Sequence, residues 1–208
     1  MSANKKIIII EDSAKMGGVQ YSTFFLAEEI IKKKSFDLMI LFPFAGPFTS
    51  LCEKYTIPFN IYNPVPYLST SISLFNDKIR IPNVFSLVYN ICLLLVNSKR
   101  AGEIIKSHNP DIVITKGMFN HLSGGLVCKI LQIPIVWHLQ DLVTDRYFGF
   151  YKLILNYIAN KVPNYIICDG QLIKASLQGE VYDRSFVVIN GIKTDDLKRC
   201  PKARKETR

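Results

Sequence analysis

The sequence predicts an α/β fold: a single Rossmann-like domain in which helices cover both faces of a parallel sheet of about seven strands. Two observations lead to this prediction. Short apolar segments alternate along the chain with longer segments of helical periodicity. The apolar segments are continuous runs, which is typical of parallel strands buried on both faces. With 208 residues, of which 49% are hydrophobic, the chain can bury a sizeable core.

The first strand and the first helix are predicted to meet at Gly17-Gly18. Four consecutive isoleucines predict a strand over Lys6–Ile10, and apolar spacings of three and four predict a helix over Val19–Lys34. A glycine pair lets backbone approach a ligand closely, and a helix N-terminus offers free N–H groups to an anion. We therefore expect Gly17, Gly18 and Val19 to bind a phosphate- or diphosphate-bearing substrate. A flexible turn without a ligand is the alternative.

The remaining elements continue the alternation of strands and helices. Strands are expected over Leu38–Phe42, Ile57–Tyr62, Asp111–Thr115, Pro134–Leu139, Tyr165–Cys168 and Phe186–Ile189. Helices are expected over Phe48–Tyr55, Pro82–Ser107, Phe119–Gln132, Tyr147–Lys161 and Gln171–Leu177. Asp169 is the expected N-cap of the last helix. The Pro- and Ser-rich segment Asn63–Pro82 is expected to be a long irregular loop.

Five groups of glycine or polar residues follow predicted strands. They are Gly17-Gly18, Lys116-Gly117, His138–Asp141, Asp169-Gly170 and Asn190-Gly191. The carboxyl ends of parallel strands meet at one edge of the sheet, where ligands bind in such folds. We therefore expect all five groups to converge on one site.

His138 and Asp141 are the expected catalytic residues of this site. A histidine near a carboxylate can orient a substrate hydroxyl or accept a hydrogen bond from it. The alternative for His138 is a structural histidine covered by the next helix. Trp137 points to the opposite side of the strand and is expected in the core, and His108 and His121 are expected at the surface.

The basic and polar residues at the same edge are the expected ligand contacts. Lys116 and Arg146 can pair with phosphate as cations, although solvated loop cations are an equal alternative. Asn190 and Gly191 are expected to complete the binding site. We expect no metal site, because the five cysteines are scattered without a C-x-x-C pair, which indicates free thiols in a reducing compartment.

Composition and missing motifs narrow the function classes. No G-x-G-x-x-G, Walker loop or H-E-x-x-H is present, so dinucleotide oxidoreductases, P-loop NTPases and zinc proteases have no motif support. The net charge of +9 favours anionic lipid, nucleic acid or phosphorylated substrates. The longest apolar stretch, Val84–Val96, is too short to span a bilayer. We expect a cytoplasmic protein that is peripheral on the inner face of a membrane.

Five segments, in this order, resemble the N-terminal domain of glycosyltransferase family 4 enzymes of the GT-B type. They are Gly17–Ile30, Asn109–Ile114, Ile133–Asp141, Tyr165–Leu177 and Val187–Ile192, so the resemblance extends over nearly the whole chain. The resemblance implies a retaining transferase of polysaccharide biosynthesis that moves a hexose-type sugar from a nucleotide-sugar to a glycan or lipid-linked acceptor. It implies Gly18 near the donor diphosphate, an acceptor-side loop at Asn63–Pro82, and neither a cofactor nor a nucleic-acid partner.

Several positions depart from the family pattern. Gln140 stands where the family has a histidine, with His138 two residues earlier, Gly170 stands at a serine position, and Lys193 at an aspartate position. No two glutamates have the E-x7-E spacing of the family's donor-binding domain. We therefore expect residues 1–192 to form an acceptor-side domain and residues 193–208 to be a basic remnant of the interdomain linker.

The missing donor site leaves three hypotheses open. The first is half of a glycosyltransferase, a fragment or truncated reading frame that is inactive without a donor-binding domain. The second is a non-catalytic subunit that binds acceptor or membrane and recruits a separate donor-binding subunit. The third is an unrelated flavodoxin-like or other nucleotide-binding domain. An adjacent reading frame with a lone E-x7-E domain would favour the second, and frame-shifted remnants of that domain would favour the first.

Overall fold

The structure is a computed structural model that describes residues 4–34, 36–74, 79–141 and 150–191. Within these ranges the main sheet has seven parallel strands in the order β3-β2-β1-β6-β7-β8-β9. The strands are β1 (Lys6–Ile10), β2 (Asp37–Phe42), β3 (Phe59–Ile61), β6 (Ile112–Lys116), β7 (Ile135–Leu139), β8 (Tyr165–Cys168) and β9 (Ser185–Val187). The predicted fold class is confirmed.

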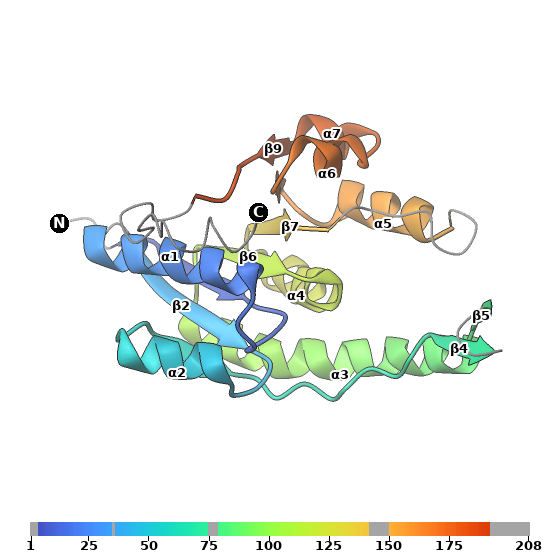
Figure 1. Cartoon of the computed structure of the whole chain (residues 1–208), viewed down its shortest axis with the longest axis horizontal. Helices are drawn as coiled ribbons and strands as arrows, with labels where there is room; N and C mark the ends of the chain where they lie inside the picture. Colours follow the sequence, from blue (N-terminus) through green and yellow to red (C-terminus); the bar gives the residue numbers. More distant parts are fainter. Residues whose placement is uncertain (1–3, 35, 75–78, 142–149, 192–208) are drawn as a thin grey trace, which may run out of the picture.

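Helices cover both faces of this sheet (Figure 1). They are α1 (Gly18–Lys33), α2 (Pro47–Lys54), α3 (Val84–His108), α4 (Met118–Leu131), α5 (Phe150–Lys161), α6 (Gln171–Ala175) and α7 (Glu180–Asp183). Successive strand residues point to opposite faces, so Ile7 and Ile9 pack with α1 and α2, whereas Ile8 and Ile10 pack in the core beneath α3, α4 and α5. Trp137 is fully buried in this second core, as predicted.

The expected irregular loop at Asn63–Pro82 is partly wrong. Its second half forms an antiparallel pair of strands, β4 (Ser71–Leu74) and β5 (Ile79–Pro82). Its first half, residues 63–70, is an extended segment that runs antiparallel to α3, and we call it the strap. At its start Arg100 donates to the carbonyl of Asn63, and at its end the Asn83 N–H donates to the carbonyl of Thr70 at 2.9 Å.

Two asparagines of α3 hold the strap by its backbone. Asn97 accepts from the Val65 N–H at 2.7 Å and donates to the Val65 carbonyl at 2.9 Å. Asn90 makes the same two bonds with Leu68, at 2.9 and 2.8 Å. Seven helical residues rise about 10 Å, and three extended residues cover about the same length. The two amides therefore match the repeat of the strap.

The ends of other elements also differ from the predictions. Asp169 is not the N-cap of α6, since the cap is Gly170 and no side chain caps it. Helix α3 begins after Asn83, whose side chain accepts from the Ser86 N–H at 3.2 Å. The predicted helix start at Tyr147 and the predicted tail at 193–208 lie outside the described residues.

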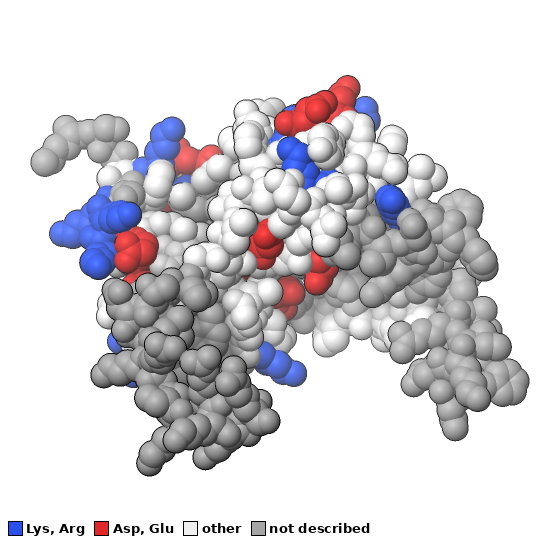
Figure 2. All heavy atoms as spheres, turned by 45° about the horizontal axis from the view of Figure 1, so that its top comes forward, with Lys and Arg blue, Asp and Glu red and all other residues white. Residues whose placement is uncertain are grey.

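Several lysines of the described surface gather at the C-terminal end of α1. Figure 2 shows basic groups at the end of the molecule where α1 stops, and Lys32 and Lys33 lie in its last turn. Both pair with Glu29, at 3.8 and 3.9 Å. Across the described ranges, none of the helices combines the length and the apolar character needed to cross a bilayer.

Candidate functional site

A pocket of about 340 Å³ opens at the carboxyl edge of the sheet. Its lining comes from the loops after β1, β6 and β7 and from the first turns of α1 and α4. Five of the predicted site residues line it together: Gly17, Gly18, Val19, His138 and Asp141. Three of the five predicted groups therefore share one rim, namely Gly17-Gly18, Lys116-Gly117 through its glycine, and His138–Asp141, and the roles of these residues remain predictions.

Two helix N-termini face this pocket. Helix α1 begins after Gly17 and α4 after Gly117, and neither cap residue supplies a side-chain hydrogen bond. The first N–H groups of a helix have no intrahelical acceptor, and in these two helices the cap residue does not supply one either. These N–H groups can therefore bind an anion. Gly117 has a φ of 78°, and a Cβ there would lie 2.5 Å from the Cβ of Asp12, so this turn requires glycine. A Cβ at Gly18 would meet no atom within 4 Å, which leaves the space above α1 open to a ligand.

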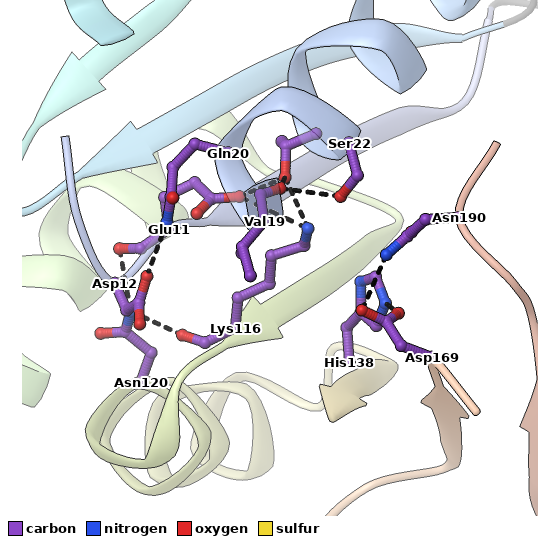
Figure 3. Close-up of polar contacts among 11 residues, drawn as sticks. Glu11, Asp12, Val19, Gln20, Ser22, Lys116, Asn120, His138, Asp169 and Asn190 are labelled. Atoms are coloured by element: carbon purple, nitrogen blue, oxygen red, sulfur yellow. Dashed lines mark hydrogen bonds and ion pairs between the residues drawn. The ribbon is translucent and has the colours of Figure 1, made fainter. Parts of the chain in front are cut away.

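His138 is held by a carboxylate, but not by the predicted one. Its Nε2 lies 2.5 Å from Oδ1 of Asp169, and Asn190 donates to Oδ2 of the same carboxylate at 2.8 Å (Figure 3). Asp141 lies on the rim of the same pocket. Burial lowers the pKa of His138, and the nearby Lys116 lowers it further, against the opposing effect of Asp169. The imidazole is therefore neutral at pH 7.

Lys116 lies beneath the pocket, so the alternative of a solvated loop cation is wrong, and its pairing with phosphate stays a prediction. It is the last residue of β6 and is 1% exposed. Its Nζ lies 3.6 Å from Oε1 of Glu11 and donates to the Thr23 hydroxyl at 2.5 Å (Figure 3). Burial raises the pKa of Glu11 and lowers that of Lys116. This ammonium contacts protein groups, and Arg146 lies outside the described residues.

The other polar residues predicted at this edge lie beside the pocket. Asn190 reaches it through Asp169, whereas Gly191 is not part of the lining. Gln140, which stands where the resembling family has histidine, lines the pocket itself. The four cysteines within the described ranges are free thiols. In the same ranges, no cluster of three His, Cys, Asp or Glu side chains could hold a metal ion.

His121 was expected at the surface, and that expectation is wrong. It is 2% exposed, stacks on Trp137 with ring centroids 4.8 Å apart, and forms a 2.8 Å hydrogen bond with the Thr115 hydroxyl. Burial lowers its pKa to about 3, so the ring stays neutral. A sequence signal existed, because His121 shares a helical face with Gly124, Gly125 and Cys128 at spacings of three, four and seven.

Asn120 is a second residue that the sequence did not single out. Its Nδ2 donates to the carbonyls of Glu11 and Lys116, both at 2.9 Å, and its Oδ1 accepts from the Tyr62 hydroxyl at 2.9 Å. It thereby ties together the ends of β1 and β6 and the segment after β3. Asp12, directly after Glu11, also lines the pocket. A single asparagine or aspartate forms no motif with a distinctive spacing, so the sequence could not predict the contacts of Asn120 or the position of Asp12 in the pocket.

Comparisons with known proteins agree with this architecture. No family model matches the sequence. Over 133 residues the chain is 28% identical to the UDP-N-acetylglucosamine–N-acetylmuramyl-(pentapeptide) pyrophosphoryl-undecaprenol N-acetylglucosamine transferase of Colwellia psychrerythraea, a match that covers 61% of this chain and 33% of that protein.

Solved structures show the same fold. The chain matches Anabaena HepE in complex with UDP-glucose with a TM-score of 0.66 and 18% identity, over 97% of this chain and 49% of that one. It also matches the UDP-GlcNAc 2-epimerase of Methanocaldococcus jannaschii with a TM-score of 0.53 and 15% identity, over 89% and 45%. The chain spans about half the length of these structures. Its fold is the Rossmann-like α/β fold of GT-B glycosyltransferases such as HepE.

Proposed function

We propose that this chain is the N-terminal, acceptor-side half of a retaining, nucleotide-sugar-dependent glycosyltransferase similar to family 4. It takes part in transferring a hexose-type sugar to a glycan or lipid-linked acceptor in polysaccharide biosynthesis. The observation that carries the proposal is the pocket at the carboxyl edge, where two helix N-termini without side-chain caps and a neutral histidine face one space. The HepE complex with UDP-glucose and the name of the Colwellia relative support the substrate class.

The pocket has two chemically different sides. The glycine side, at Gly17, Gly18 and Gly117, offers backbone N–H groups, which suit a diphosphate. The other side carries His138 and Asp141, and the Asp141 carboxylate repels phosphate and accepts hydrogen bonds from hydroxyl groups. Asp12 lies beside Gly117 on the glycine side, where its Oδ1 accepts from Gln20 at 3.4 Å. We place the donor diphosphate against the backbone N–H groups of the glycine side and the sugar or acceptor hydroxyls against the side of Asp141.

This polarity fits the chemistry of sugar transfer. The bond between the anomeric carbon and the diphosphate oxygen breaks as the bond to the acceptor oxygen forms, through an oxocarbenium-like transition state. Negative charge develops on the leaving diphosphate, where fixed N–H donors stabilise it at no cost of reorganisation. His138 and Asp141 are the proposed catalytic residues, because they can bind and orient reacting hydroxyl groups.

An exposed apolar face on α3 supports an acceptor presented by a membrane. The apolar side chains exposed on its first half are Val84, Phe85, Leu87, Val88, Tyr89, Ile91, Leu95 and Val96. This half extends beyond α4 in Figure 1, and the basic residues Lys99 and Arg100 follow it. We propose that this face rests on an anionic lipid surface at the inner side of a membrane, since the Colwellia relative carries a pyrophosphoryl-undecaprenol substrate in its name.

The second candidate is a non-catalytic subunit that binds the same acceptor and recruits a separate donor-binding subunit. The exposed apolar face on α3 favours it, because a membrane or a partner subunit can cover this face. Calorimetry with UDP-sugars on the isolated chain tests both candidates at once, because in both the nucleotide-binding part of the donor site lies on a separate domain or subunit. We expect binding no tighter than about 1 mM. Micromolar affinity would contradict both candidates and favour a self-contained nucleotide-binding domain.

Adding the missing half separates the two candidates from each other. We expect sugar transfer from a UDP-sugar when the chain is joined to a family 4 donor-binding domain in one polypeptide. Transfer only with a separately expressed partner, and not with the fusion, would favour the subunit. Epimerisation of the UDP-sugar without transfer would overturn the glycosyltransferase proposal.

A further inference from the structure

We infer that Asp169 is a positioning residue that fixes His138 as the tautomer protonated at Nε2, with Asn190 holding the Asp169 carboxylate in place. The inference depends on the proposed function only for the role of His138 in binding a ligand. The tautomer itself is a property of the free chain.

Three neighbouring strands place these residues in a row along the carboxyl edge. In the sheet register, Leu139 of β7 lies opposite Cys168 of β8, and Cys168 lies opposite Val187 of β9. His138 therefore precedes the edge by one residue, and Asp169 follows β8 directly. Asn190 comes from the segment after β9. The Asp169 carboxylate thus lies between the imidazole and the amide, as Figure 3 shows.

The hydrogen-bond donors in this row follow from its chemistry. A carboxylate has no proton to give, so the 2.5 Å contact between Asp169 Oδ1 and His138 Nε2 requires the hydrogen on Nε2. The other oxygen of Asp169 accepts from Nδ2 of Asn190 at 2.8 Å. With both oxygens engaged, the carboxylate has a fixed orientation. In a neutral ring, Nδ1 is then the nitrogen that accepts a hydrogen bond.

The charged groups around His138 keep the ring neutral. Lys116 lies directly opposite it in the neighbouring strand β6, and His121 of α4 lies close enough for the two rings to influence each other's charge. Lys116 disfavours a positive His138, together with burial, whereas Asp169 favours it. A neutral, oriented imidazole accepts a hydrogen bond from a hydroxyl and does not neutralise a phosphate. His138 thereby helps to make its side of the pocket a hydroxyl site.

The experiment is nitrogen-detected NMR of the 208-residue chain with labelled histidine. His138→Gln assigns the His138 signals among the three histidines. At pH 7.5 we expect Nε2 to be protonated and Nδ1 to be unprotonated, with a strongly downfield Nε2 proton. A protonated Nδ1, or a doubly protonated ring, in the wild-type chain would overturn the inference without any variant.

Variants then identify the residue that fixes the tautomer. In Asp169→Ala we expect the downfield proton to disappear and the ring to become a mixture of both tautomers. Asn190→Ala should keep the Nε2 tautomer and move its proton upfield. Asp141→Ala is the matched control, because this carboxylate lines the pocket without contacting His138, and we expect it to leave the tautomer unchanged. An unchanged tautomer in Asp169→Ala, with the His121 signals still native, would refute the role of Asp169.

The same variants separate this inference from the proposed function. In an enzyme completed with a donor-binding domain, we expect Asp169→Ala to lower kcat about 10- to 100-fold and to alter its pH profile. If the completed wild-type enzyme shows no sugar transfer while His138 has the expected tautomer, the proposed function is refuted and the positioning role of Asp169 stands. Normal transfer at an unchanged pH profile in Asp169→Ala would sink the positioning role alone.

Discussion

The Tyr62 hydroxyl donates to Oδ1 of Asn120 at 2.9 Å, in a buried layer directly beneath the pocket. The same amide donates to the carbonyls of Glu11 and Lys116. One side chain on α4 therefore fixes the relative positions of three strand ends. This side chain thereby holds the backbone that directly precedes the pocket residues Asp12 and Gly117.

Asn120→Ala is expected to destabilise the protein by about 2–4 kcal/mol, because it leaves a hydroxyl and two carbonyls without their partner in a buried layer. Urea unfolding followed by circular dichroism measures the change. Tyr62→Phe, which removes one of the three bonds, is the matched control and should cost about 1 kcal/mol. If the urea midpoint of Asn120→Ala equals that of the wild type, these hydrogen bonds make no net contribution to the free energy of unfolding.

The stability of the protein should fall as the pH drops from 6.5 towards 3. Burial lowers the pKa of His121 from 6.5 to about 3, so the unfolded chain binds a proton in this window that the folded chain does not. The resulting stabilisation is fully present above pH 6.5 and is lost as the pH falls. Between pH 7.5 and pH 5 it amounts to about 2 kcal/mol. The lowered pKa of His138 acts in the same direction.

Urea midpoints at pH 7.5 and pH 5 measure this dependence. His121→Gln keeps a hydrogen-bond partner for Thr115 and has no titrating ring, so it should flatten the pH dependence. An equally steep loss in that variant would assign the effect to other groups.

Gly18→Leu should abolish sugar transfer in an enzyme completed with a donor-binding domain. The side chain would fill the open space above the first turn of α1 and block the approach of the diphosphate. Gly170→Leu is the control, since a Cβ there also meets open space but Gly170 is not part of the pocket lining. Turnover of the UDP-sugar measures both, and unchanged turnover in Gly18→Leu would remove this glycine from the binding site.

The chain is expected to sediment with phosphatidylglycerol vesicles at low ionic strength. The combined variant Phe85→Ser and Val88→Ser should weaken binding at least several-fold, because it removes apolar area that inserts below the headgroups. Leu172→Ser is the matched control, for Leu172 is 76% exposed on α6 and Phe85 is 77% exposed on α3. An equal loss of vesicle binding in both variants would mean that the apolar face on α3 is not the membrane-binding surface. Failure of the wild-type chain to bind the vesicles would refute the proposed membrane contact.

The strands and the shared rim could be predicted because they follow from local patterns. Runs such as Ile7–Ile10 specify buried strands whatever lies around them, and the edge rule brings their following loops together. Gly18 and His138 line one pocket for this reason.

The pairings inside the site could not be predicted, since they join residues far apart in the chain. Asp141 is three residues after His138 in the sequence, but the imidazole is hydrogen-bonded to Asp169 instead. This is because β8, which Asp169 follows, pairs with β7 in the sheet. Lys116 can be buried because it forms an ion pair with Glu11, which follows the neighbouring strand β1. These residues are 105 positions apart, so no local sequence pattern indicates the pair. The position of the strap was missed in the same way, because its anchors lie on α3.

The strap has a consequence for how related chains can diverge. Asn90 and Asn97 recognise only main-chain atoms of Val65 and Leu68. Any residue except proline, which has no N–H, can make the same four bonds at those two positions, so the side chains of the segment can change while its backbone path stays the same. Evolution can therefore vary the chemistry of this part of the surface without changing the helix that holds it in place.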